Sequence, residues 1–241
     1  MQPRIMEERI LYLDIETVPG SSNYQELPER VAKLWDKKAA IIGRNDPDLT
    51  PEDLYERAGI YAEFGKIVCI STGYMYRSKE GEQFRVTSFS SDDELELLTD
   101  FSRLLNRHFN DLRYHRLCAH NGKEFDFPFI ARRMLVHRIS LPDLLNLQGK
   151  KPWEIPHIDT MEMWKFGDYK NFTSLDLLSA LFDLPTPKDD IDGSQIYQVY
   201  YGDNDLDRIV KYCEKDVVAL ARVHRRLSGM PDFGLDQVVA V

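Results

Sequence analysis

The segment that most constrains the fold is residues 10–17, Ile-Leu-Tyr-Leu-Asp-Ile-Glu-Thr. Its apolar and β-favouring residues predict a strand. Because side chains alternate between the two faces of a strand, the odd-numbered apolar residues from Leu11 to Ile15 should share one buried face. Asp14 and Glu16 then point together to the other face, at the end of a strand whose composition is typical of the middle of a sheet.

Two neighbouring carboxylates repel each other and lose hydration at such a position, unless a cation lies between them. A divalent ion with oxygen ligands fits this requirement, and Mg²⁺ or Mn²⁺ suits a site made of carboxylates. The alternative is a strand that runs out into solvent, with Asp14 and Glu16 as ordinary surface charges. A motif this short does not decide between the two interpretations.

Composition is typical of a soluble globular protein, and the length fits one large domain or two small ones. The chain has 241 residues, of which 43% are hydrophobic and 29% charged. It contains neither an apolar run of membrane-spanning length nor a secretory signal at its start, so we expect a cytoplasmic protein. Cys69, Cys118 and Cys213 have no metal-binding spacing, which predicts reduced, buried thiols. The net charge of −9 argues against a protein that coats nucleic acid irrespective of sequence.

The remaining chain alternates strand and helix patterns, with a helical insertion at about residues 19–65. Within it Leu27, Val31 and Leu34 have helical spacing, and Thr50 with Pro51 is typical of a helix start. After the insertion we expect a strand at 66–76 and a strand at 83–90 that forms a hairpin with it. A helix capped by Ser91 or Asp92 follows, with apolar positions Leu95, Leu98, Phe101, Leu105 and Phe109. The rest of the chain predicts a strand at 114–119, a helix from Phe125 to about Val136, a short strand at 157–160, a helix at 172–182 and a last helix at 205–227.

Two more parts of the chain carry candidate chemistry. Asp126 stands where a strand-end loop enters a helix, which is where α/β sheets usually bind their ligands. On the last helix Tyr212 and Asp216 are one turn apart, at the edge of an apolar stripe that runs from Leu206 to His224. A carboxylate beside a buried stripe is costly unless it has a partner. The alternative is a surface aspartate next to a half-buried tyrosine, which is common in amphipathic helices.

Together these motifs resemble the DEDD exonuclease superfamily in kind and in order. The motifs are residues 14–17 (Asp-Ile-Glu-Thr), 121–126 (Asn-Gly-Lys-Glu-Phe-Asp) and 212–216 (Tyr-Cys-Glu-Lys-Asp). Tyr212 indicates the tyrosine branch, because the histidine branch has a histidine nearer the last aspartate. Within that branch, residues 125–130 (Phe-Asp-Phe-Pro-Phe-Ile) are similar to the second motif of the proofreading exonuclease domain of family-B DNA polymerases.

The resemblance covers about residues 10–227, and residues 188–194 and 212–218 are similar to stand-alone relatives of that domain. No room remains for polymerase palm, fingers or thumb domains, so residues 1–241 are expected to be one exonuclease domain. All four acidic positions of the superfamily are present. The departure from the family pattern is His120, which precedes Asn121 where the polymerase domains more often have another residue.

The resemblance implies an α/β fold of the ribonuclease-H-like type, a mixed five-stranded sheet with one antiparallel strand and flanking helices. It also implies two divalent ions, Mg²⁺ or Mn²⁺, at a catalytic site. Asp14 is expected to bridge both ions, Glu16 and Asp216 to complete the site on the side of the nucleophile, and Asp126 to support the second ion. Tyr212 is expected to orient the attacking water, because a phenol with a pKa near 10 is a poor base at pH 7.

Substrate contacts are expected from Thr17, Asn121 and Phe125, although Asn121 is equally typical of a turn residue in the left-handed region. A basic group can contact substrate phosphates but is better explained as a solvated face; it comprises Arg132, Arg133, His137, Arg138, Lys150 and Lys151. Aromatic residues can stack on bases, although most are expected in the core; they are Phe125, Phe127, Phe129, Trp153, Trp164 and Phe166, with Phe127 and Trp153 the first to test.

The leading hypothesis is a stand-alone, metal-dependent 3′–5′ exonuclease that acts on the 3′ ends of single-stranded DNA. The first alternative is a 3′–5′ exoribonuclease with the same site, because other members of the tyrosine branch trim RNA. The second is a non-catalytic module that binds nucleic acid or a protein partner on the same fold. A missing carboxylate would favour this last alternative, and none is missing.

Overall fold

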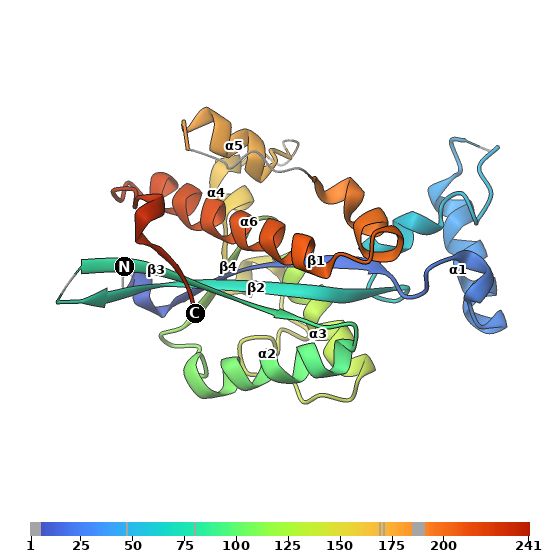
Figure 1. The fold of residues 1–241 in the computed structure, drawn as a ribbon, viewed down its shortest axis with the longest axis horizontal. Coiled ribbons are helices and arrows are strands. Elements are labelled where there is room, and N and C mark those ends of the chain that lie inside the picture. Colours follow the sequence, from blue (N-terminus) through green and yellow to red (C-terminus); the bar gives the residue numbers. More distant parts are fainter. Residues whose placement is uncertain (1–5, 47, 80, 169, 171, 185–190) are drawn as a thin grey trace.

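A central mixed sheet organises the molecule, with helices on both of its faces (Figure 1). The computed structural model describes residues 6–46, 48–79, 81–168, 170, 172–184 and 191–241. Its strands are β1 (Ile10–Pro19), β2 (Gly65–Ser78), β3 (Gly81–Ser90), β4 (Arg116–Ala119), β5 (Ile158–Asp159) and β6 (Val238–Ala240).

The strand order, β5-β4-β1-β2-β3-β6, is that of a ribonuclease-H-like sheet with one added edge strand. β2 is antiparallel to both β1 and β3, whereas β4 and β5 continue the sheet parallel to β1. The expected α/β fold and its five strands are therefore confirmed. The sixth strand, β6, was not predicted, because three residues at the edge of a sheet have too little pattern of their own.

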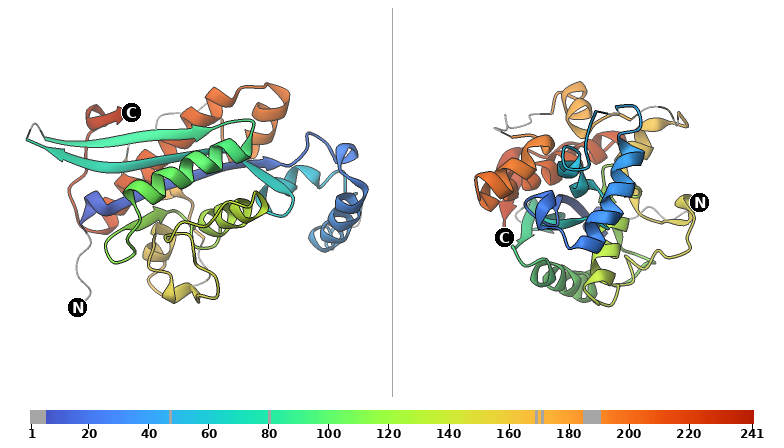
Figure 2. Two further views of the ribbon diagram at one scale, coloured as in Figure 1. Left: turned by 90° about the horizontal axis from the view of Figure 1, so that it is seen from below. Right: turned by 90° about the vertical axis from the view of Figure 1, so that its right-hand side faces the viewer.

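Two helical layers enclose the sheet. On one face lie α2 (Glu94–His108) and α3 (Asp126–Val136), and on the other lies α6 (Leu206–Leu227), with α4 (Thr160–Lys165) and α5 (Leu175–Leu181) stacked beyond it (Figures 1 and 2). The predicted buried face of β1 is confirmed, because Leu11, Leu13 and Ile15 belong to the core under α2 and α3. The opposite face of β1 therefore turns Asp14 and Glu16 toward α6.

Close contact between α6 and the sheet depends on Gly73 of β2. A Cβ atom at this position would lie 2.3 Å from the ring of Phe84 and 2.9 Å from a methyl group of Val217 on α6. The predicted apolar stripe of α6 is also confirmed, since Ile209, Cys213, Val217, Leu220 and His224 are buried. Gly73 and this stripe together hold one face of α6 against the strand that carries the two carboxylates.

The insertion between β1 and β2 projects beyond the end of the sheet (Figure 1). It contains α1 (Glu29–Ile42) and a 3₁₀ helix (Tyr55–Ile60), packed around the buried ring of Trp35. The helix start predicted at Thr50 is wrong. Thr50 and Asp53 do exchange the hydrogen bonds of a cap, but these close a turn rather than begin an α-helix.

Several predicted boundaries differ by a few residues from the observed ones. Asp93 caps α2, in place of Ser91 or Asp92. Leu95, expected on the buried face of this helix, is exposed, whereas Leu97 enters the core. The helix predicted at 172–182 begins at Leu175, because Ser174 caps it. The short helix α4 was not predicted. Among the described residues, no helix is both long enough and apolar enough to cross a membrane.

Candidate active site

The first two site residues lie side by side on β1, facing α6. A register shift in the pairing of β1 with β2 falls between Glu16 and Thr17, directly after the carboxylates. Glu16 is only 8% exposed, whereas Asp14 is partly open to solvent. Within the described part of the chain, no hydrogen bond or ion pair satisfies the Glu16 carboxylate. A buried acid without such a partner is costly, so this strand end carries an electrostatic strain that a bound cation would relieve.

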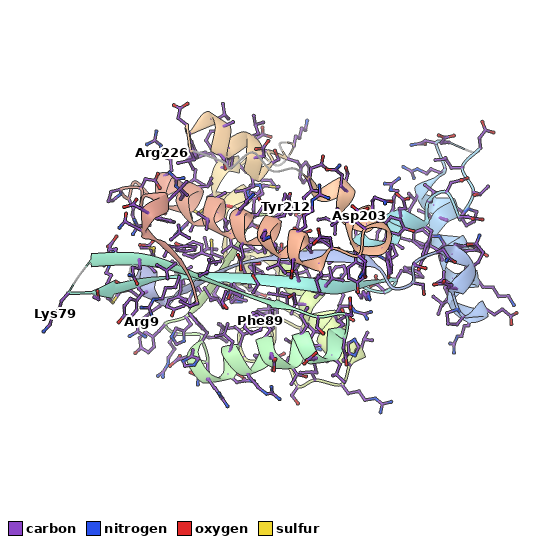
Figure 3. The ribbon with its side chains drawn as sticks, in the orientation of Figure 1. Arg9, Lys79, Phe89, Asp203, Tyr212 and Arg226 are labelled. Carbon is purple, nitrogen blue, oxygen red and sulfur yellow. The ribbon has the colours of Figure 1, made fainter. Side chains whose placement is uncertain are left out.

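Helix α6 brings three further polar groups to the same place. The Cys213 thiol lies 3.5 Å from the Asp14 Oδ2 atom and 3.5 Å from the Asp14 carbonyl oxygen. Tyr212, one residue earlier, donates its hydroxyl hydrogen bond to Asp216 one turn later. Figure 3 places Tyr212 on α6 above the sheet. The one-turn spacing of Tyr212 and Asp216 thus forms a local pair directed at the strand carboxylates.

Asp126 enters the site from the other helical layer, as the first residue of α3. The backbone N–H of Ile15, between the two strand carboxylates, donates to the Asp126 carboxylate. The loop that leads to Asp126 is tightly folded: Asn121 has a φ of 62°, and a Cβ atom on Gly122 would lie 2.3 Å from that of Ala119. Asn121 is therefore a turn residue in the left-handed region, as one of its two interpretations expected.

A carboxylate that the sequence did not single out, Asp159, holds this loop in place. It is only 3% exposed, at the end of β5. Its oxygens accept hydrogen bonds from the backbone N–H groups of Asn121, Lys123, Met161 and Glu162 at 3.0–3.3 Å. Asp159 thus joins the loop before Asp126 to the start of α4. Its N-cap position before a short helix was a possible signal, but residues 160–165 did not stand out as a helix.

The charges of the cluster act on one another. Burial, followed by the charges of Glu16, Asp126 and Asp216, raises the pKa of Asp14 well above its usual range. Burial and the charge of Asp216 do the same to the pKa of Glu16. The pKa of Asp126 rises to about 7, mainly through burial, although the hydrogen bond from Ile15 opposes this shift. The structure thus brings Asp14, Glu16, Asp126 and Asp216 into one mutually repelling group.

This group fits divalent metal ions. A carboxylate oxygen of Asp14, a carboxylate oxygen of Glu16 and the sulfur of Cys213 all lie within 4.8 Å of one another. None of the ion pairs between described residues involves Asp14, Glu16 or Asp126. A hard divalent cation with oxygen ligands would compensate these charges and use the Asp14, Glu16 and Asp126 carboxylates, which have no cation among the described residues.

The surroundings of Tyr212 favour a role in orientation rather than proton abstraction. Burial, together with the charges of Asp216 and Glu16, raises the pKa of the Tyr212 hydroxyl well above its ordinary value. The phenol therefore stays protonated at neutral pH and has a hydrogen to donate. Such a group can fix the position of a neighbouring polar atom but is a poor general base.

The two other predicted substrate residues occupy different environments. Thr17 is half-buried, on β1 immediately after the register shift. Phe125 precedes α3 and is half-buried against the core, with its ring centroid 5.5 Å from that of Phe129. Of the aromatic residues chosen for a first test, Phe127 is fully buried in the core, whereas Trp153 is 77% exposed. Base stacking by Phe127 would therefore require the core to open.

Two members of the predicted basic group are neither free for phosphate nor part of a solvated face. Arg133 and His137 both contact the buried carboxylate of Glu94, at 2.6 and 2.7 Å. Arg133 also donates to the carbonyl oxygen of Ala62. These residues hold α3 against α2, which the sequence pattern did not indicate. Of the predicted motif at 188–194, residues 188–190 lie outside the described residues.

The order of the strands in the sheet and the cluster of acidic residues define the class of the protein. It has a ribonuclease-H-like α/β fold with a candidate metal site at the end of its first strand. Residues 60–232 match the family described as a predicted 3′-5′ exonuclease related to the exonuclease domain of PolB. The chain belongs to this family.

Among solved structures, the chain is similar to the family B DNA polymerase from the hyperthermophilic archaeon Pyrobaculum calidifontis, with a TM-score of 0.47 and 13% sequence identity. The similarity covers 91% of this chain and 24% of the polymerase chain, so this chain spans about a quarter of that protein. No curated protein matches the sequence.

Proposed function

We propose that this protein is a metal-dependent 3′–5′ exonuclease that hydrolyses phosphodiester bonds at the 3′ end of single-stranded DNA, as one catalytic domain. The observation that carries the proposal is the buried group of Asp14, Glu16 and Asp126, which has no cation among the described residues, next to Tyr212 and Asp216. Membership of a family of predicted 3′-5′ exonucleases supports it. A structural acidic cluster would be expected to carry its own basic partners.

In this proposal the carboxylates bind two divalent ions, Mg²⁺ or Mn²⁺. Asp14, whose pKa is raised by the charges of the other three acids, would hold both ions, Glu16 and Asp216 would complete one ion site, and Asp126 would support the other. Bound divalent ions supply Lewis acidity, which makes a water more acidic and offsets the negative charge that develops on the phosphate. The protein's contribution is to hold the four acids in place from β1, α3 and α6.

The remaining site residues act on water and substrate. Tyr212 keeps its proton and orients the attacking water, held in turn by its hydrogen bond to Asp216. Asn121 and Thr17 contact the terminal nucleotide from the loop and strand that flank the carboxylates. Phe125, half-buried at the start of α3, supports the last base.

The experiment that tests the proposal is digestion of 5′-labelled oligonucleotides of DNA and of RNA with identical sequence, in Mg²⁺ or Mn²⁺ and then in EDTA. We expect stepwise shortening from the 3′ end, faster on single-stranded DNA than on duplex, and no reaction in EDTA. Faster digestion of RNA would make the protein an exoribonuclease. A closed circular DNA cut as fast as a linear one would identify an endonuclease, and binding without cleavage would identify a non-catalytic module.

A further inference from the structure

A thiol lies inside the acidic cluster, where a site for Mg²⁺ alone has no use for it. Cys213 is fully buried, and its sulfur lies 3.5 Å from Oδ2 of Asp14. The sulfur and one carboxylate oxygen each of Asp14 and Glu16 lie within 4.8 Å of one another. Magnesium and manganese favour oxygen ligands, whereas thiolates favour softer ions such as zinc.

We propose that Asp14, Glu16 and Cys213 form a second kind of metal site, which captures a thiophilic divalent cation, Zn²⁺, in place of a hard ion. Bond lengths of about 2.0 Å to a carboxylate oxygen and about 2.3 Å to sulfur, at a tetrahedral angle, separate the two ligand atoms by about 3.5 Å. The observed separation of the Cys213 sulfur and the Asp14 oxygen is 3.5 Å. This pair is already spaced as two ligands of one tetrahedral ion.

Glu16 independently indicates a ligand at this point. Its side chain is more than nine-tenths buried, with an oxygen inside the same three-residue group, and no hydrogen bond or ion pair with any described residue satisfies it. Asp14 is partly open to solvent, which leaves an entry path and a fourth position for water. Three protein ligands with one open position are an arrangement that zinc commonly adopts.

Binding differs between the two classes of ion by one proton. When Zn²⁺ binds, a metal–sulfur bond forms, the thiol S–H bond breaks, and the proton leaves to solvent. With Mg²⁺ the thiol keeps its proton and its contact to Asp14. Because both ions use Asp14 and Glu16, they compete, and zinc should inhibit the nuclease. This consequence rests on the proposed function, whereas capture of the ion does not.

The test uses Cd²⁺, a softer analogue of zinc whose bond to a thiolate gives charge-transfer absorption in the ultraviolet. The purified 241-residue protein, freed of metal and kept in excess Mg²⁺, is titrated with Cd²⁺. The chain offers a matched control in Cys118, a thiol equally buried but in a different part of the core. We expect the wild type and Cys118→Ser to give a saturable signal of one equivalent, and Cys213→Ser and Cys213→Ala to lack it.

Two further measurements separate this site from simpler explanations. Asp14→Asn keeps the thiol but removes a carboxylate, and should weaken Cd²⁺ binding by at least about tenfold, since even losing a group that merely orients a metal ligand costs about 10–100-fold. The Zn²⁺ concentration that halves nuclease activity in Mg²⁺ should rise at least about tenfold in Cys213→Ser, relative to that variant's own uninhibited rate. Melting curves confirm that each variant is folded.

The proposal is overturned if wild-type protein gives no thiolate signal at millimolar Cd²⁺, if the Cys213 variants keep the signal, or if Asp14→Asn binds Cd²⁺ as tightly as wild type. A protein that shows the cysteine-dependent signal but digests no nucleic acid would refute the proposed function while supporting the metal site. Digestion in Mg²⁺ without any thiolate signal would do the reverse.

Discussion

Two buried acids on different faces of the sheet, Glu94 and Glu16, lie in opposite environments. They are similarly buried, with 5% and 8% of their surfaces exposed. Glu94 receives the backbone N–H of Ile67 at 2.7 Å and contacts the side chains of Arg133 and His137. Glu16 has no hydrogen bond or ion pair to any described residue, and its near neighbours are other acids.

The difference shows how burial alone fails to distinguish structure from function. The groups around Glu94 match its charge, so its desolvation is offset within the fold. The acids around Glu16 add to its charge, and they raise the pKa of both Asp14 and Glu16. A folded protein retains such an arrangement when something outside the chain neutralises it. The following predictions test this contrast, beginning with the largest expected effect.

Replacement of one cluster acid should abolish activity without loss of stability. For Asp14→Asn we expect exonuclease activity to fall on the order of 10³-fold or more, because a ligand shared by both ions is lost. The metal-free protein should melt at the same temperature as wild type or higher, since one like charge is gone. Single-turnover digestion and melting curves measure the two effects. An active Asp14→Asn enzyme would contradict the proposed site.

The same type of change at Glu94 should have the opposite consequence. Glu94→Gln leaves the Arg133 guanidinium, 13% exposed, without its anion. We expect a loss of about 3 kcal/mol in the free energy of unfolding. Urea denaturation measures it, with Glu96→Gln on the exposed side of the same helix as control, for which we expect a change within about 0.5 kcal/mol. If Glu94→Gln and Glu96→Gln were equally stable, the ion pairs of Glu94 would not stabilise the fold, and Glu94 would not differ from Glu16 in this respect.

Tyr212→Phe removes only the hydroxyl from the cluster. Because the phenol remains protonated, its expected contribution is to orient water, and the single-turnover rate at saturating metal should fall about 10²-fold. Metal affinity should change little, because the carboxylates are intact. A folded Tyr212→Phe variant at the wild-type rate would show that the ring serves only for packing.

Removal of metal should make stability depend on pH in a direction unusual for acids. Asp126 has a pKa of about 7 in the folded protein, above its unfolded value of 3.8, so the native state binds more protons between these values. Stability of the metal-free protein should therefore fall as pH rises from about 4 to 7, on the order of 3 kcal/mol.

Added Mg²⁺ or Mn²⁺ should restore that stability at pH 8 and have little effect at pH 5, where protons compete with the metal. Melting temperatures at both pH values, with and without metal, measure this effect. In Asp126→Asn the metal-free pH dependence should become shallower. A metal-free wild type that is more stable at pH 8 than at pH 5 would contradict the assigned electrostatics.

The smallest effect is expected at the acid that positions the loop. In Asp159→Asn an amide NH₂ replaces an oxygen that accepts a backbone N–H, so the loop before Asp126 should shift. We expect about a tenfold rise in the Mn²⁺ concentration needed for half-maximal activity, with a smaller change in the maximal rate. Asp93→Asn, at the cap of α2, is the control for the loss of a helix cap alone. If both variants need the same Mn²⁺ concentration for half-maximal activity, Asp159 acts only as a helix cap and does not position the loop.

Periodic patterns in the sequence determined the elements and the faces they bury. Alternation along residues 10–17 was sufficient to place the carboxylates on the face opposite Leu11, Leu13 and Ile15, because the geometry of a strand is local. The 3.6-residue period similarly placed Tyr212 and Asp216 together on α6. Short elements such as β6 and α4 escaped prediction, because a few residues cannot establish a period.

The partners of the buried charges were decided only by the tertiary structure. The residue type of Arg133 permits a phosphate contact, a solvated surface or a buried ion pair, and the packing of α3 against α2 selects the last by bringing Glu94 within 2.6 Å. Asp159 holds the loop before Asp126 because the end of β5 lies next to the loop that begins at residue 121, whose N–H donates to the Asp159 carboxylate. Sequence spacing specifies which side chains share a face, but the partner of a buried charge comes from a distant segment, and its position depends on how the whole sheet is covered.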